Sequence, residues 1–271
     1  MVAFAITSVA VGFAVGILSG LLGIGGGTIL VALFSLFYGM SAISSTATSL
    51  FTIIPTSFSG ALTHIREKTC VLGIGAAAGL GGAVTSPIGV WLASLSPEWL
   101  VLIACAAVIA YSSFTMFRKA FALRSKMRRG QKQNVDSRLQ QEATHDFKVT
   151  WQTAIQGALI GMAAGLMSGY VGVGGGFLMV PLFMGILGLP MSITSGTSLI
   201  AVMILAIPGT VTQALMGNVD WLVGIAVAVG SIPGAILGAK LVKRVPELAL
   251  RFGYAVFLLA MAALLVIEQF V

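Results

Sequence analysis

The glycine-rich stretch Gly20–Gly27, which reads Gly-Leu-Leu-Gly-Ile-Gly-Gly-Gly, constrains this chain most because it occurs twice. The second copy, Gly169–Gly176, lies 149 residues later and keeps the pattern Gly-x-x-Gly-x-Gly-Gly-Gly. Aligning residues 15–50 with residues 164–199 without a gap gives 14 identities in 36 positions. The same offset continues downstream, where Pro97-Glu98 meets Pro246-Glu247. The fixed offset indicates that the chain consists of two copies of one structural unit.

Composition places both copies in a membrane. Hydrophobic residues make up 58% of the chain, charged residues only 8%, and the mean hydropathy is +1.03. An average soluble domain carries about 25% charged residues. The apolar runs are continuous, as in Ala3–Leu22 and Leu248–Ile267, whereas the strands of a membrane barrel would alternate apolar and polar residues. We therefore predict an all-α polytopic membrane protein, and the absence of a Ser/His/Asp set or a His-Glu-x-x-His motif argues against an enzyme.

The sequence divides into three parts. Residues 1–117 form a first transmembrane repeat, residues 118–149 a basic loop, and residues 150–271 a second transmembrane repeat. Each repeat is predicted to hold about five helical segments, with a broken or re-entrant helix at its glycine motif. The expected segments are Met1–Leu22, Thr28–Tyr38, Thr46–His64, Cys70–Ala93 and Ser96–Phe117, then Trp151–Val171, Phe177–Leu187, Ile193–Leu215, Trp221–Val242 and Pro246–Ile267.

Basic residues predict opposite orientations for the two repeats, because Lys and Arg concentrate in cytoplasmic loops. In the first repeat, Arg66 and Lys68 follow the third segment, and the loop after the fourth segment has no basic residue. In the second repeat the order reverses, with Lys240, Lys243 and Arg244 after the fourth segment. We therefore expect inverted repeats, with the loop 118–149 cytoplasmic and both termini outside. Inversion requires an odd number of crossings in each repeat, so residues 1–38 are expected to form two crossings or a re-entrant hairpin.

The same charges bear on partners and cofactors. The net charge of +7 comes from three short basic stretches, which indicates membrane topology rather than nucleic-acid binding. Cys70 and Cys105 are expected within apolar helices, so we predict no disulfide, no metal site and no cofactor. His64 ends the third predicted segment, and beside Arg66 and Glu67 it is assigned to the membrane interface.

The glycine motifs and the hydroxyl-rich segments after them predict a binding site for a small anion. Non-helical backbone at membrane depth lines a cavity or is buried in protein, and free amides at helix N-termini attract anions. Four helix starts, two of them at the glycine breaks, are expected to converge on the anion near the midplane. The alternative is that the glycines only pack helices and the hydroxyls only cap them or bond back to carbonyl groups. The candidate binding residues are Gly25, Gly26, Gly27, Thr28, Ser45, Thr48, Ser49, Gly174, Gly175, Gly176, Thr194, Ser195, Thr197 and Ser198.

A family resemblance rests on the doubled glycine motif and on two further pairs of sequences. Val31-Ala32-Leu33 and Val180-Pro181-Leu182 follow the motif, and Ala47-Thr48-Ser49-Leu50 pairs with Gly196-Thr197-Ser198-Leu199. Together these residues resemble the sulfite exporter TauE/SafE family of membrane permeases over nearly the whole chain. The first copy departs from the second at Ala32, where the second has Pro181.

The resemblance implies a multi-pass protein of a bacterial or archaeal inner membrane that moves small anions. Typical substrates are sulfur-containing oxyanions such as sulfite, sulfoacetate or related organosulfonates. The resulting hypothesis is a secondary transporter that binds the anion at the two glycine motifs and works by alternating access of its repeats. An anion channel and a non-transporting membrane scaffold or sensor remain as alternatives.

Overall fold

The computed structural model describes residues 2–128 and 150–268, and all regular secondary structure in these residues is helical. The first repeat contains α1 (Val2–Leu22), α2 (Gly27–Tyr38), α3 (Ala42–Arg66), α4 (Leu72–Leu95) and α5 (Glu98–Arg128). The second repeat contains α7 (Trp151–Val171), α8 (Gly176–Ile186), α9 (Met191–Leu215), α10 (Trp221–Leu241) and α11 (Glu247–Glu268). The short 3-10 helix η1 (Val242–Arg244) joins α10 to α11.

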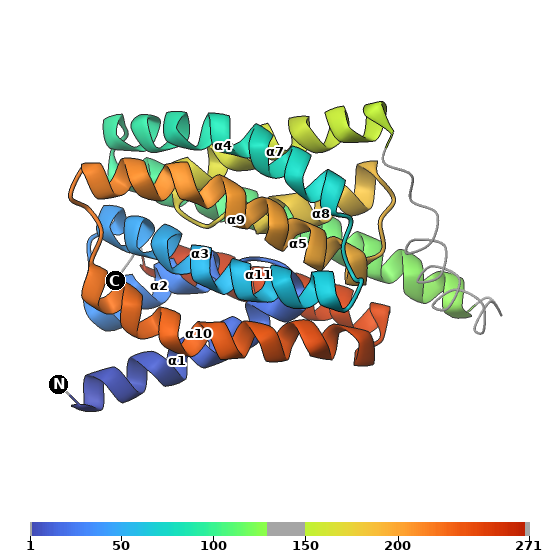
Figure 1. Cartoon of the computed structure of the whole chain (residues 1–271), viewed down its shortest axis with the longest axis horizontal. Helices are drawn as coiled ribbons and strands as arrows, with labels where there is room; N and C mark the ends of the chain where they lie inside the picture. The colour runs from blue at the N-terminus through green and yellow to red at the C-terminus, as the bar shows by residue number, and fades with distance from the viewer. Residues whose placement is uncertain (1, 129–149, 269–271) are drawn as a thin grey trace.

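The long helices lie side by side in a bundle whose axis is horizontal in Figure 1. Within the described residues, four segments are long and apolar enough to cross a membrane, namely α4, α7, α9 and Trp221–Arg244. Large apolar side chains cover the outside of the bundle, including Leu80, Val84 and Leu222, which are 64%, 68% and 70% exposed. Such a surface suits contact with lipid, where every backbone polar group must be satisfied within the helices. The predicted all-α polytopic membrane class is confirmed.

The helix contacts repeat with the same offset as the sequence. α1 packs along α10, and its counterpart α7 packs along α4, as Figure 1 also shows. A Cβ atom on Gly20 would lie 2.9 Å from the amide nitrogen of Ala239, and one on Gly169 would lie 2.9 Å from that of Val90. The helices approach this closely because glycine has no side chain. Each repeat therefore contributes one helix to a close pair with the other repeat.

Counterpart helices run antiparallel. Along the central pair α3 and α9, Gly60 lies against Leu199, whereas Leu50 lies against Gly209. Antiparallel counterparts are the arrangement that inverted repeats require. The N- and C-terminal ends of the described chain lie at one end of the bundle in Figure 1, and α5 extends beyond the bundle at the other.

α1 and α2 form the hairpin that the charge pattern required. The turn is made by the first glycine break, where a Cβ atom on Gly26 would lie 3.6 Å from the Cβ of Ser19. At the far end of α2, the hydroxyl of Tyr38 hydrogen-bonds that of Ser8 at 2.7 Å. α2 has only 12 residues and ends at the left-handed Gly39. It is therefore shorter than the roughly 20 residues that span a bilayer.

Most boundaries lie within two residues of the expected ones, and three differences are informative. α3 begins at Ala42 rather than Thr46, because Ser41 caps it by accepting a hydrogen bond from the Ser44 amide at 3.3 Å. α5 continues past Phe117 to Arg128, since its basic end is rich in good helix formers. The first residues of the expected loop 118–149 are thus helical, and residues 129–149 lie outside the described part. Cys70 lies in the turn between α3 and α4 rather than within a helix.

The basic loops share one end of the bundle. Lys243 Nζ lies 2.7 Å from Glu67 Oε2, and this ion pair joins the α3–α4 turn to η1. The charge pattern had assigned these two turns to the same side of the membrane, and the ion pair agrees with that assignment. We call this end, with Arg66, Lys68 and Lys243, the basic end.

Candidate functional site

The two glycine breaks meet in the buried interior. A Cβ atom on Gly176 would lie 2.6 Å from the carbonyl oxygen of Ile24, and one on Gly27 would collide with the carbonyl of Val173. Gly25 has a φ of +83°, a left-handed conformation that residues with a side chain rarely adopt. α2 and α8 both begin at this crossing, so two positive helix ends meet there.

The breaks share a backbone conformation but differ in side chains. Gly26 and Gly175 are the left-handed N-cap residues of α2 and α8. Two residues later, Thr28 in α2 occupies the position that Phe177 occupies in α8. The Thr28 hydroxyl is buried and has no hydrogen-bond partner among the described residues. Polar character around the crossing is therefore unevenly distributed between the repeats.

Two of the candidate serines tie the breaks to the central helices. Ser198 on α9 donates a hydrogen bond to the carbonyl oxygen of Gly23 at 2.7 Å. Its counterpart Ser49 on α3 donates to the carbonyl oxygen of Gly172. Both serines are fully buried. Carbonyl groups at helix ends lack intrahelical partners, so these hydroxyls satisfy the chain where α1 and α7 end.

Two of the candidate threonines form hydrogen bonds with the backbone at the starts of α4 and α10. Thr197 accepts a hydrogen bond from the Val71 amide at 2.9 Å, and Thr48 accepts one from the Asp220 amide at 3.0 Å. Val71 and Asp220 are the N-cap residues of α4 and α10. These threonines thus have a structural reason to recur in both repeats. Capping of helices was the alternative to anion binding for these hydroxyls.

The remaining candidate hydroxyls bond back to nearby carbonyl groups. Thr194 donates to Pro190 at 2.8 Å, Ser195 to Met191 at 3.1 Å, and Ser45 to Met40 at 3.4 Å. α3 and α9 run antiparallel, so their starts lie at opposite ends of the bundle. The expectation that four helix starts converge is therefore wrong, because only the starts of α2 and α8 meet.

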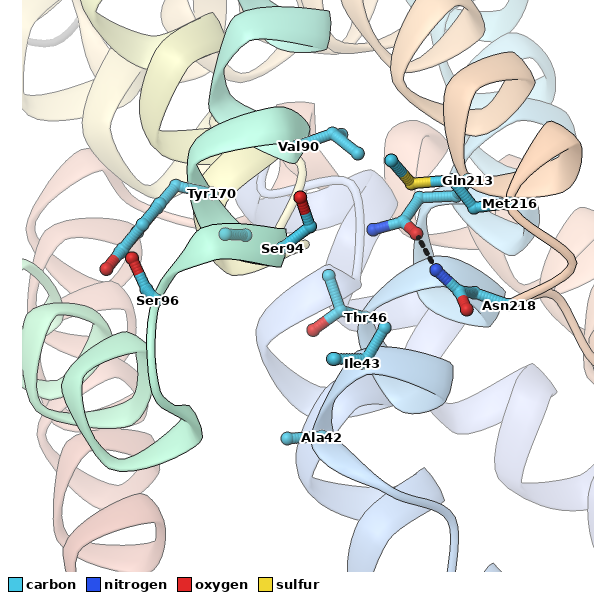
Figure 2. A pocket seen from close by; sticks show the side chains of 11 residues that line it. Ala42, Ile43, Thr46, Val90, Ser94, Ser96, Tyr170, Gln213, Met216 and Asn218 are labelled. Atoms are coloured by element: carbon cyan, nitrogen blue, oxygen red, sulfur yellow. Dashed lines mark hydrogen bonds between the residues drawn. The ribbon is translucent and has the colours of Figure 1, made fainter.

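A cavity of about 230 Å³ opens at the end of the bundle opposite the basic end. In Figure 2, Thr46 and Ile43 border it from α3, Ser94 from α4, and Gln213 with Asn218 from the end of α9. Asn218 Nδ2 donates to Gln213 Oε1 at 2.7 Å, the bond drawn in Figure 2. Thr46 Oγ1 lies 3.3 Å from the carbonyl oxygen of the residue before Gly172, so the cavity reaches the second glycine break.

The equivalent region at the basic end is closed. Residues 149 positions from the cavity lining include Ser192, His64 and Thr69, the counterparts of Ile43, Gln213 and Asn218. Ile43 is 39% exposed, whereas Ser192 is 3% exposed. We call the cavity and its equivalent region at the basic end the two vestibules. The first is open, and the residues of the second are buried.

His64 is part of this closure. Its Nδ1 lies 2.7 Å from Thr69 Oγ1 and its Nε2 lies 3.0 Å from the carbonyl oxygen of Gly20 at the end of α1. The side chain is fully buried in the protein, and its assignment to the membrane interface stays a prediction. The imidazole joins α3 to α1 because Gly196 on α9 leaves room beside it, with a Cβ there only 2.8 Å from the imidazole Cγ.

Charged residues complete the closure at the basic end. Glu247 accepts a hydrogen bond from the Met191 amide at the start of α9 at 2.7 Å, and Arg251 donates to the same carboxylate at 2.8 Å. Farther out, the hydrogen bond from Lys243 lowers the pKa of Glu67 below its ordinary value. The Glu67 carboxylate therefore stays charged, and the ion pair intact, until the pH falls through that lowered pKa.

The cavity residues Tyr170, Gln213 and Asn218 were not among the candidate residues. Of these, Gln213 had a sequence signal, because it is the counterpart of His64 in the repeat. A second hollow of about 370 Å³ lies between α3 and α10 at the basic end, where Arg66, Glu67 and Lys240 line it, and its lining includes no residue of either break. No group of three or more potential metal ligands occurs in residues 2–128 and 150–268.

Comparison with known proteins agrees with this architecture. The family model described as Sulfite exporter TauE/SafE matches residues 8–265. The chain belongs to the TauE/SafE family. The probable membrane transporter protein YdhB of Bacillus subtilis (strain 168) is 30% identical over 257 residues, which cover 94% of this chain and 97% of YdhB. The probable membrane transporter protein YunE of the same organism is 28% identical, with 86% of this chain and 85% of YunE covered.

No solved structure matches the chain. The TauE/SafE match spans both glycine breaks and both repeats, as the sequence resemblance implied. Family and relatives together identify a membrane transporter, and the crossing breaks with their adjoining cavity are its candidate substrate site.

Proposed function

We propose that the protein is a secondary transporter of a small anion, a sulfur oxyanion or organosulfonate, and that it works by alternating access of its two repeats. The observation that carries the mechanism is the difference between equivalent vestibules, one open at Ile43 and one closed at Ser192. In inverted repeats, exchanging the conformations of the two halves would close the first vestibule and open the second. A continuous pore is less consistent with a fully buried His64 at the closed end.

The proposed site is the crossing of the two breaks, formed by the candidate glycines with Thr28 and by the serines that bond the breaks, Ser49 and Ser198. Support comes from the two helix N-termini that begin at Gly27 and Gly176, since such ends favour negative charge. The start of α3 at Ala42 borders the open cavity and presents a third positive helix end to an arriving anion. The printed name of the family supports a sulfur oxyanion as the substrate class.

The proposed orientation puts the basic end, together with residues 118–149, in the cytoplasm and both termini outside. It rests on the gathering of Arg66, Lys68 and Lys243 at one end of the bundle. In this orientation, within a bacterial or archaeal inner membrane, the open cavity faces the cell exterior. The proposal also includes the division of the chain into two transmembrane repeats joined by a basic loop.

Transport is tested with purified protein in liposomes. Uptake of sulfite, sulfoacetate, sulfate and chloride is compared under equal gradients, with protein-free liposomes as the control. The proposal expects saturable flux that selects a sulfur-containing anion over chloride. Flux that never saturates would favour a channel, and no flux of any anion would refute the anion-transporter assignment.

Alternating access is tested with single cysteines on a background in which Cys70 and Cys105 are replaced by alanine. Ile43→Cys and Ser192→Cys are matched variants at equivalent positions of the two vestibules. A membrane-impermeant thiol reagent is expected to label Ile43→Cys from outside and to label Ser192→Cys only from the cytoplasmic side. Turnover with substrate should slow the first reaction and speed the second. Rates that do not respond to substrate would count against alternating access.

A further inference from the structure

Three buried hydroxyl groups without partners surround the first glycine break. Ser19, Thr28 and Ser57 are at most 1% exposed, and no described residue hydrogen-bonds their hydroxyl oxygens. The hydroxyl of Ser57 faces Gly25, because a Cβ atom on that glycine would lie 3.3 Å from Ser57 Oγ. Ser19 Oγ lies 3.8 Å from the corresponding position on Gly26. Ser19 on α1 and Ser57 on α3 thus pack against the turn from which α2 starts, and Thr28 lies in the first turn of α2.

These hydroxyls are three of eight buried hydroxyls without a partner in the described residues. Buried serine and threonine commonly donate to a carbonyl one turn earlier, as Thr52 and Thr56 do in the same helix as Ser57. A buried hydroxyl without a partner costs about 1–3 kcal/mol, so groups of this kind call for an explanation. A ligand that accepts their protons would supply one.

The second glycine break has a different environment. Phe177 and Ala206 stand at the positions equivalent to Thr28 and Ser57, and only Ser168, the counterpart of Ser19, keeps a hydroxyl there. Both breaks have the same backbone, so the asymmetry lies in side chains alone. Hydroxyls without partners thus number three at the first break and one at the second.

We propose that the first break, with the α2 N-terminus and the hydroxyls of Ser19, Thr28 and Ser57, binds a single compact oxyanion group. This inference rests on the proposed function and specifies its site. The ligand chemistry is a sulfite ion or the sulfonate head of a larger molecule, held by neutral donors. A Cβ atom on Gly25 would lie 3.4 Å from Ile53 and 2.8 Å from Val202, so these side chains pack directly against the break and must shift to admit even a small group.

Neutral donors suit a ligand that must be released. Amides at a helix start and hydroxyl groups stabilise an anion without a permanent countercharge, and buried cation partners would bind more tightly. The charged residues described above, Glu67, Lys243, Glu247 and Arg251, are engaged in ion pairs at the basic end. The second break, poorer in donors, then serves mainly as a moving partner of the first.

The test compares Ser57→Ala and Ser19→Ala with Ser168→Ala, the counterpart substitution in the second break. Binding of sulfite and of methanesulfonate to detergent-purified protein is measured by titration, and the thermal midpoint is measured without ligand. A hydrogen bond to a charged group accounts for about 10- to 100-fold in affinity, so the first two variants should weaken binding by that factor. Ser168→Ala should change affinity by less than about twofold.

The ligand-free thermal midpoint separates a binding role from a structural one. Removing a hydroxyl that has no protein partner should leave this midpoint unchanged or raise it. A lower midpoint for Ser57→Ala would reveal a protein partner and overturn the inference. Tighter binding of sulfite than of methanesulfonate would identify a free inorganic oxyanion, and the reverse would identify a sulfonate head.

The outcome for this site is distinguishable from the outcome for transport. If the wild-type protein carries a sulfur anion and Ser57→Ala and Ser19→Ala bind it as tightly as wild type, the inference fails and the transporter assignment stands. Equal losses in Ser19→Ala and Ser168→Ala would also overturn it, because they would show a symmetric site. If wild type neither binds nor carries any of these anions, the proposed function itself fails.

Discussion

Replacing Gly176 by alanine tests whether the two breaks must touch for the protein to work. The added methyl carbon would lie 2.6 Å from the carbonyl oxygen of Ile24 and 2.7 Å from that of Gly23. Carbon and carbonyl oxygen rarely approach within about 3.3 Å, so the breaks must separate by about 0.5 Å or more. Both obstructing atoms are backbone and cannot rotate away. We expect a loss of about 3 kcal/mol in the free energy of unfolding, at the upper end of typical overpacking costs.

Transport should fall more than stability, because the displaced Gly23 carbonyl is the one that Ser198 holds at 2.7 Å. The assay is sulfite uptake into liposomes, read beside the thermal midpoint in detergent. Gly253→Ala is the matched control, since a Cβ at Gly253 in α11 meets nothing within 4 Å. That change should stabilise the helix by about 0.5–1 kcal/mol and leave transport intact. A Gly176→Ala protein that melts and transports like wild type would show that the close approach of the breaks is not required.

Three other changes give further tests. Ser198→Ala should cost about 1–3 kcal/mol, measured by thermal or chemical unfolding, because the buried carbonyl of Gly23 loses its partner. Arg251→Ala should cost about 3 kcal/mol in the same assay, since it removes the cation from a carboxylate side chain that is 6% exposed. Lowering the pH through the depressed pKa of Glu67 should break its pair with Lys243 and speed thiol labelling of Ser192→Cys at the basic end. When Glu67→Gln is added to that variant, the labelling should be fast at every pH.

Much of the fold was predictable because the duplication and the charges constrain it independently. The repeat fixed which helices correspond, and Arg66, Lys68 and Lys243 fixed which turns lie together. Both breaks were located to within a residue, because only glycine provides a backbone like that of Gly25 at φ +83°. The sequence pattern does not show that α1 pairs with α10 rather than with α4, since that choice depends on contacts between distant segments.

The candidate site was predictable only in part. Hydroxyl residues were chosen by their recurrence in both halves, and recurrence favours structural roles such as the bonds of Thr48 and Thr197 to helix starts. Ser57 escaped notice because its counterpart is alanine, so comparing the halves removed it from consideration. The open cavity also escaped, because a difference between equivalent vestibules is a property of one conformation and is not encoded at any single position.

The packing of α1 and α4 against helices of the other repeat has a consequence for biosynthesis. The ribosome delivers α1 and α4 well before α10 and α7 exist, so the glycine-lined faces of the early helices enter the bilayer without their final neighbours. A half-made chain therefore cannot complete its packing and must remain loosely assembled until the last helices arrive. Assembly of this protein is thus completed late, by the pairing of α1 with α10.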